Sequence, residues 1–120
     1  MRIAIDLDGT ICPIKKEGES YSDLHPLPGA VERISELRKS GHFIIILTAR
    51  NMATRGGNIG SVMKHVGKMT LDWLEHHNVE YDEIFFGKPN AEIYIDDRGV
   101  RFEDWEGLTE EYLKIMGRSR

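Results

Sequence analysis

The strongest structural constraint in this sequence is the run FIIIL at residues 43–47. It is apolar at every position and rich in β-branched residues, a pattern typical of a strand that is buried on both faces. Strands of this kind occur in parallel sheets, because the helices that connect parallel strands cover both faces of the sheet. The run therefore predicts an α/β protein.

Strand and helix patterns alternate along the rest of the chain. Short apolar runs predict three more strands, at 3–5, 83–86 and 91–95. Helical spacing of apolar residues predicts three helices, at 28–41, 61–78 and within 106–120. Residues 11–27 are rich in breakers and are expected to form a loop. This order predicts a single domain, 1–120, with a parallel sheet between two helical layers.

Composition excludes several classes of protein. The 120 residues suffice for one core, and 40% hydrophobic with 30% charged residues is typical of a soluble globular protein. The net charge of −4 disfavours a protein that binds the phosphate backbone of nucleic acids without sequence preference. No apolar run reaches the ~18–20 residues of a membrane span, and Asp6 and Asp8 interrupt the N-terminus where a secretory signal would be apolar. The single cysteine, Cys12, fits a reducing compartment, so a cytoplasmic protein without a membrane partner is expected.

Polar side chains follow four predicted strands at the point where each strand ends. They are Asp6 and Asp8, Thr48 and Arg50, Lys88, and Asp96 with Asp97. In open parallel sheets, ligands bind beyond the carboxyl ends of the strands. These side chains are therefore expected to line one crevice.

Asp6 and Asp8 form the first of these groups. Side chains two residues apart on an extended chain project to the same side, so both carboxylates can serve one reacting centre. One can act as nucleophile and the other as proton donor, if their environments separate their pKa values. Gly9 allows a sharp turn that brings backbone N–H groups near an anion. Asp-Gly is also a common turn former, which by itself is enough to explain Asp8.

The remaining groups have both a functional and a structural interpretation. Thr48 can bind a phosphate oxygen or bond to backbone at the strand end, and Lys88 can neutralise a phosphoryl group or be a solvated lysine. Adjacent carboxylates such as Asp96 and Asp97 repel unless a cation or several donors lie between them. With Asp6 they make an all-oxygen set that suits Mg²⁺. Helix capping explains one of the two aspartates but not both.

In this order, the residues resemble the four motifs of the haloacid dehalogenase (HAD) superfamily, across residues 3–98. The stretches 48–60 and 81–89 look like small HAD phosphatases associated with capsular and other surface polysaccharide synthesis. The resemblance implies a three-layer, Rossmann-like fold with helices on both faces of the sheet. It also implies no cap domain, because 11–27 and 51–82 are too short to hold one. Such an open site suits a large substrate or is covered by a neighbouring subunit, and 11–27 would act as a flap.

The resemblance also implies roles for individual residues. Asp6 would attack the phosphoryl group and form an aspartyl-phosphate, and Asp8 would protonate the leaving oxygen and then deprotonate water. Thr48 and Lys88 would hold the phosphoryl oxygens. The Mg²⁺ ligands that it implies are Asp6, Asp8, Asp96 and Asp97, with Asp97 favoured as the direct ligand of the last pair. The substrate-binding residues that it implies are Gly9, Thr10, Ala49 and Arg50. Outside the motifs, three further side chains could reach the substrate or be solvated: Arg55, Asn58 and Lys64.

The resulting hypothesis is a Mg²⁺-dependent phosphatase that acts on a phosphosugar or a similar small metabolite, with a homo-oligomer left open. A nucleotidase or polynucleotide 3′-phosphatase is the alternative enzyme, suggested by Asp96-Asp97-Arg98 and the missing cap, although the charge of −4 disfavours long nucleic acids. A receiver-like phosphoacceptor without catalysis would place its acidic pair first and its lysine last, which is not the order here. A folded partner subunit that no longer uses its site is disfavoured by four intact motifs.

Overall fold

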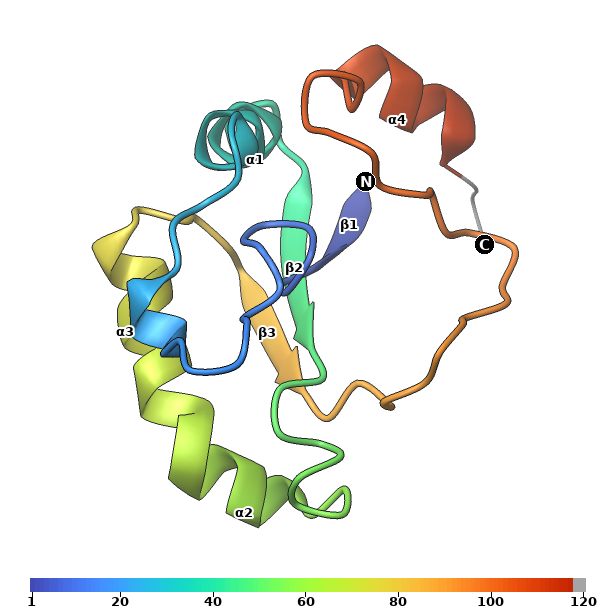
Figure 1. The fold of residues 1–120 in the computed structure, drawn as a ribbon. Coiled ribbons are helices and arrows are strands. Elements are labelled where there is room, and N and C mark those ends of the chain that lie inside the picture. Colours follow the sequence, from blue (N-terminus) through green and yellow to red (C-terminus); the bar gives the residue numbers. More distant parts are fainter. Residues whose placement is uncertain (118–120) are drawn as a thin grey trace.

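The three strands of the protein form one parallel sheet in the order β1-β2-β3 (Figure 1). The structure is a computed structural model that describes residues 1–117. The strands are β1 (Arg2–Asp6), β2 (Phe43–Thr48) and β3 (Glu83–Phe86), which confirms the strands expected at 3–5, 43–47 and 83–86. The α/β class with a parallel sheet is confirmed.

The strand register places the carboxyl ends of all three strands at one edge. Asp6 lies beside Leu47, and Thr48 lies beside Phe86. Every group that follows β1, β2 or β3 therefore starts from the same edge of the sheet.

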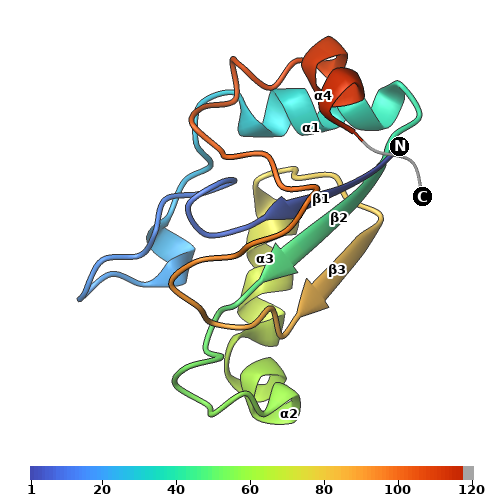
Figure 2. The ribbon, with the colours of Figure 1, turned by 90° about the vertical axis from the view of Figure 1, so that its right-hand side faces the viewer.

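Two helices pack onto the sheet and form the core. They are α1 (Ala30–Lys39) and α3 (Lys68–His76), seen from the side in Figure 2. Ile34 of α1 and Leu74 of α3 are fully buried in one cluster with Ile46 of β2. Gly29, with φ of +82°, begins α1 in the left-handed conformation that glycine adopts without strain. The helix expected at 28–41 is confirmed.

The helix expected at 61–78 is present but is divided into three parts. It consists of α2 (Ile59–Val62), the π-helical turn η2 (Met63–Gly67) and α3. A π turn inserts one extra residue and rotates every later side chain around the axis. Thr70 is therefore fully buried, whereas Leu71 is 37% exposed.

The loop at 11–27 and the C-terminal region both pack on the body of the protein. The loop contains one short 3₁₀ helix, η1 (Tyr21–Asp23), and no hairpin. The indole of Trp105 is buried and donates to the Thr10 carbonyl at 2.7 Å. The helix expected within 106–120 is α4 (Glu110–Met116), while residues 118–120 lie outside the described part of the chain. Among the described residues, no helix is both long and apolar enough to cross a membrane.

The expectation of a fourth strand at 91–95 is wrong for the single chain. Residues 89–99 are all exposed, and none of them belongs to a strand. The segment leaves β3 at Lys88 and runs wide of the sheet on the side of β1 before it returns at Trp105 (Figure 1). A strand forms only where a neighbour pairs with its backbone N–H and C=O groups, and within residues 1–117 no strand pairs with this segment.

Candidate active site

Asp6 and Lys88 meet at the carboxyl edge of the sheet. The Lys88 ammonium lies 3.4 Å from Asp6 Oδ2, with 20% and 35% of the two side chains exposed. The backbone N–H of Lys88 donates to the Thr48 carbonyl at 3.1 Å, so the end of β2 fixes the lysine opposite the end of β1. A half-exposed carboxylate beside an ammonium group can approach a phosphoryl group whose charge the lysine offsets.

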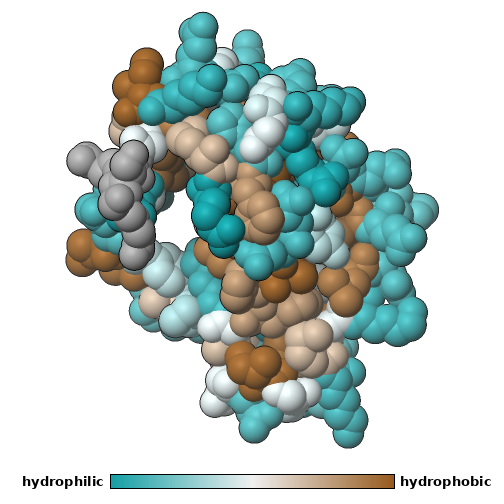
Figure 3. All heavy atoms as spheres, turned by 180° about the vertical axis from the view of Figure 1, so that it is seen from behind, coloured by the Kyte–Doolittle hydropathy of each residue, from teal (hydrophilic) through white to brown (hydrophobic). Residues whose placement is uncertain are grey.

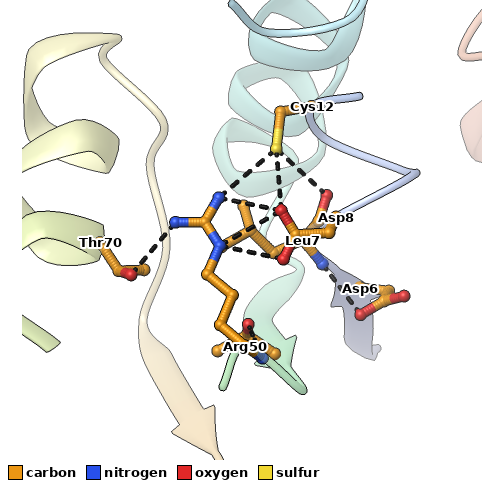
Figure 4. Close-up of polar contacts among 7 residues, drawn as sticks. Asp6, Leu7, Asp8, Cys12, Arg50 and Thr70 are labelled. Carbon is orange, nitrogen blue, oxygen red and sulfur yellow. Dashed lines mark hydrogen bonds and ion pairs between the residues drawn. The ribbon is translucent and has the colours of Figure 1, made fainter. Parts of the chain in front are cut away.

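The Asp8 side chain binds Arg50 (Figure 4). Arg50 Nε donates to Asp8 Oδ2 at 2.9 Å, and Arg50 Nη2 donates to Asp8 Oδ1 at 3.0 Å. The arginine side chain has no solvent exposure, whereas 24% of Asp8 is exposed. Arg50 also donates to the Thr70 hydroxyl at 3.1 Å and lies 4.1 Å from the Tyr21 ring centre. Arg50 is therefore neither a solvated charge nor directed at a substrate, since its guanidinium fixes the carboxylate of Asp8.

Cys12 completes the environment of Asp8. Gly9 adopts a φ of +86° and donates to the Cys12 carbonyl at 2.7 Å, which folds the chain back on itself after Asp8. The Cys12 thiol then donates to Asp8 Oδ1 at 3.5 Å. Burial, and after it the negative charge of Asp8, raises the pKa of the Cys12 thiol to about 12, so the thiol keeps its proton. Burial and then Asp8 also raise the pKa of Tyr21.

Three members of this cluster were not predicted as site residues: Cys12, Tyr21 and Thr70. The position of Cys12, four residues after Asp8 across an Asp-Gly turn, is the one sequence signal that points to it. Thr70 reaches Arg50 only because the π turn rotates it inward, and nothing in the helical spacing indicates that rotation.

Thr48 is buried, with 1% of its surface exposed, and its hydroxyl accepts from the Arg50 backbone N–H at 3.1 Å. The structural interpretation of this threonine is therefore the one observed. The N–H groups of Gly9 and Thr10 are bonded within the turn, to the carbonyls of Cys12 and Leu7, rather than directed at an anion. Ala49 is partly buried next to Thr48.

Among the described residues, none of the three side chains outside the motifs is hydrogen-bonded to this centre. The Asn58 side chain accepts from the Ser61 backbone N–H at 2.9 Å and caps α2. Lys64 is exposed on η2. Arg55 Nε is buried without a hydrogen-bond partner among the described residues.

The structure does not bring Asp96 and Asp97 to the other carboxylates. Asp96 Oδ1 accepts from the backbone N–H groups of Arg98 and Gly99 in its own turn, at 2.7 and 2.6 Å. These bonds lower the pKa of the Asp96 carboxyl. The Asp97 side chain is 78% exposed. Among residues 1–117, no three histidine, cysteine, aspartate or glutamate side chains are grouped so that they could hold a metal ion.

Comparison with solved structures places the chain in a family. No family model and no curated protein sequence matches the chain. Among solved structures, the crystal structure of a protein target from Vibrio cholerae is 35% identical in sequence. The match covers 96% of this chain and 94% of that one, with a TM-score of 0.85. This chain belongs to the same family as the Vibrio cholerae protein. The description of that structure names no activity, so the family relationship carries no function.

A second solved structure shares the fold. It is the D,D-heptose bisphosphate phosphatase from B. bronchiseptica, complexed with magnesium and phosphate. The identity is 18% and the TM-score 0.51, over 77% of this chain and 53% of that one, so this chain spans about half the length of the phosphatase. At this identity the likeness shows the fold alone.

The arrangement of the single chain does not fit a magnesium ion. Asp6 faces Lys88, Asp8 is bound by Arg50, and Asp96 accepts hydrogen bonds within its own turn. Mg²⁺ needs several oxygen ligands around one point, which these three carboxylates do not surround. The chemistry of the donor set suits the ion, but the placement of the segment that carries Asp96 and Asp97 does not.

Proposed function

We propose that the protein is a phosphatase of the HAD superfamily that hydrolyses a phosphomonoester of a small metabolite, most simply a phosphosugar. The observation that carries the proposal is the contact between Asp6 and Lys88 at the carboxyl edge of the sheet. It is supported by the four motifs in HAD order and by the fold shared with a phosphatase complexed with magnesium and phosphate. The phosphosugar class follows the resemblance of 48–60 and 81–89 to phosphatases of polysaccharide synthesis.

In the first step, a carboxylate oxygen of Asp6 attacks phosphorus. An Asp6–O–P bond forms as the bond from phosphorus to the alcohol oxygen of the substrate breaks. Asp8, which takes up a proton as the substrate brings negative charge into the site, gives that proton to the leaving oxygen. The Lys88 ammonium, which already lies 3.4 Å from Asp6, offsets the negative charge as nucleophile and phosphoryl group approach each other.

In the second step, a water molecule attacks the phosphorus of the aspartyl-phosphate. Asp8, now ionised, takes a proton from the water as the Asp6–O–P bond breaks. Inorganic phosphate leaves, Asp6 regains its carboxylate, and Asp8 regains its proton. Asp8 must face the same side of phosphorus in both steps, first toward the leaving oxygen and then toward the water, and the buried Arg50 is the positioning residue that fixes its orientation.

Mg²⁺ belongs to this proposal as the cofactor, because it would screen the phosphoryl charge from the carboxylates. The single chain does not gather its ligands, so no step above is assigned to the ion.

The test is a phosphate-release screen over sugar phosphates, nucleotides and end-phosphorylated oligonucleotides, with Mg²⁺ and with EDTA. We expect release from sugar phosphates, and loss of release in EDTA and in Asp6→Asn. Asp72→Asn is the matched control, because Asp72 is an exposed carboxylate that pairs with Lys68 on α3. Full activity of Asp6→Asn, or no release from any compound, would contradict the proposal. Release from 3′-phosphorylated oligonucleotides alone would favour the polynucleotide phosphatase instead.

A further inference from the structure

We infer that the active site is completed by a second copy of the chain, whose 91–97 segment pairs with the free edge of β1 and delivers its Asp96 and Asp97 to Asp6 and Asp8. This inference rests on the proposed function. It follows from an exposed segment with a strand sequence, an unpaired strand edge, and the length of chain that separates them.

The segment at 91–95 has the sequence of a buried strand but is exposed. Ile93 and Ile95 are 70% and 91% exposed, and Tyr94 is 48% exposed. Adjacent large apolar side chains on an extended segment mark a surface that another chain covers. Contacts of Tyr94 with its own chain are local, since its hydroxyl donates to the Pro89 carbonyl and its ring lies 4.3 Å from the Lys88 ammonium.

The edge of β1 is the matching acceptor. Within residues 1–117, β1 pairs only with β2. The bonds Phe43 N–H to Met1 O and Leu7 N–H to Leu47 O show that the odd-numbered residues of β1 face β2. In a parallel ladder the peptide groups of the even-numbered residues then point outward. An unpaired strand edge is a template for another strand.

A chain cannot pair the whole of its own 92–96 segment with this edge and also place the acidic pair at the active end. If Asp96 lay beside Asp6 in a parallel pairing, residue 92 would lie beside Arg2, which is opposite Phe43 at the far end of β2. The backbone of Lys88 is fixed at Thr48, at the near end of β2.

The distances show that a strand of this full length cannot come from the same chain. From Thr48 to Phe43 is about 16 Å along the strand, and the free side of β1 is about 10 Å across from β2. The straight line is therefore about 19 Å, and it passes through the body of the sheet. Four residues, from 88 to 92, span at most about 14 Å. A register with Asp97 beside Asp6 adds one residue, reaches about 18 Å, and still falls short.

A segment from another copy has no such tether. Each copy carries one free strand segment and one free strand edge, so two copies satisfy each other in a closed two-fold pair. Figure 3 shows an opening through the molecule on the side where the 88–104 segment runs in Figure 1. Both ends of the segment are anchored on their own chain, at Lys88 and at Trp105. Each chain of the pair would therefore place its segment against β1 of the other chain.

The decisive experiment compares two purified heterodimers, selected with one affinity tag on each copy, in phosphate release with Mg²⁺. The first pairs an Asp6→Asn copy with an Asp97→Asn copy. Shared sites leave one intact site, and we expect about half of the wild-type activity, from two variants that are inactive alone. The second pairs a wild-type copy with an Asp6→Asn/Asp97→Asn copy. Shared sites leave no intact site, and we expect no activity.

Sites built within one chain give the opposite result, namely no activity in the first heterodimer and about half in the second. That result would overturn the inference while leaving the proposed function standing. Absence of phosphate release by the wild-type protein would instead refute the proposed function.

The mass of the protein in solution tests the pairing without any activity. We expect the wild-type protein to sediment as a dimer with Mg²⁺ present, and Ile95→Asp to sediment as a monomer. Ile115→Asp is the control, since Ile115 is 80% exposed on α4 and lies outside the proposed contact. A monomeric wild-type protein, or an Ile95→Asp dimer as stable as the Ile115→Asp dimer, would overturn the inference.

Discussion

Replacement of Arg50 by methionine tests the arrangement around Asp8. The change keeps a long apolar stem but removes the guanidinium, which makes its strongest contacts to Asp8 at 2.9 and 3.0 Å. Breaking a fully buried ion pair by removing one partner costs about 3–5 kcal/mol. Because 24% of the Asp8 side chain is exposed, water replaces part of what the carboxylate loses, and the lower end applies. We therefore expect Arg50→Met to lower the free energy of unfolding by about 3 kcal/mol.

The assay is urea denaturation followed by the fluorescence of Trp73 and Trp105, which are both buried in the core. A loss of this size also lowers the melting temperature by roughly 10–15 °C in a domain of this length. Arg2→Met is the matched control, because the Arg2 and Glu83 side chains are 64% and 43% exposed at a distance of 3.2 Å. Such an exposed pair contributes about 0–1 kcal/mol.

Equal losses in Arg50→Met and Arg2→Met would refute the buried pair. A double-mutant cycle adds an independent check, since Arg50→Met should cost at least about 1 kcal/mol less in an Asp8→Asn background than in the wild type. Additive effects would mean that Arg50 contributes through packing rather than through Asp8.

Three further predictions follow from local features. The Cys12 thiol, whose pKa burial raises to about 12, should resist alkylation near pH 8 in the folded protein and react readily in denaturant, and fast labelling of the folded protein would contradict this. The Ile44 amide, and after it an arginine side chain, lowers the pKa of Asp82 below 3.8, so its stabilisation is present above that pH and is lost as the pH falls through the lowered pKa. The gap between the urea midpoints of wild type and Asp82→Asn should therefore narrow as the pH falls through and below the ordinary range of an aspartate, and a constant gap would count against it. Gly9→Ala and Gly18→Ala should each lower the free energy of unfolding in urea titrations by about 1 kcal/mol, because both glycines have φ near +85°. Only Gly9→Ala should reduce phosphate release, and equal activity of the two variants would contradict the role of the Gly9 turn.

Much of the fold could be predicted because its signals are local. The run at 43–47 predicts a buried strand from its own composition, and the parallel sheet follows from it. The contact between Asp6 and Lys88 follows in turn, because both residues come after parallel strands whose carboxyl ends lie at one edge.

The environment of Asp8 could not be predicted in the same way. Arg50 is far from Asp8 in sequence, and an arginine beside a glycine-rich loop is usually solvated. The buried Arg50 side chain donates to Thr70, which faces inward after the π turn at 63–67. A π turn inserts a residue without altering the composition of the helix, so the apolar spacing at 61–78 predicts a helix but not its division.

The segment at 91–95 shows a different limit. Its composition predicts that the backbone will pair and that Ile93 and Ile95 will be buried, but composition does not say which strand, or which chain, provides the partner. Assigning the partner to the same chain led to the wrong fourth strand. The number of residues between Lys88 and Asp96 excludes a parallel crossover within one chain, because such a crossover needs a dozen or more residues and this connection is far shorter. A strand pattern that follows another strand too closely for a parallel crossover, and that forms no antiparallel hairpin with it, should therefore be interpreted as a candidate for pairing between chains.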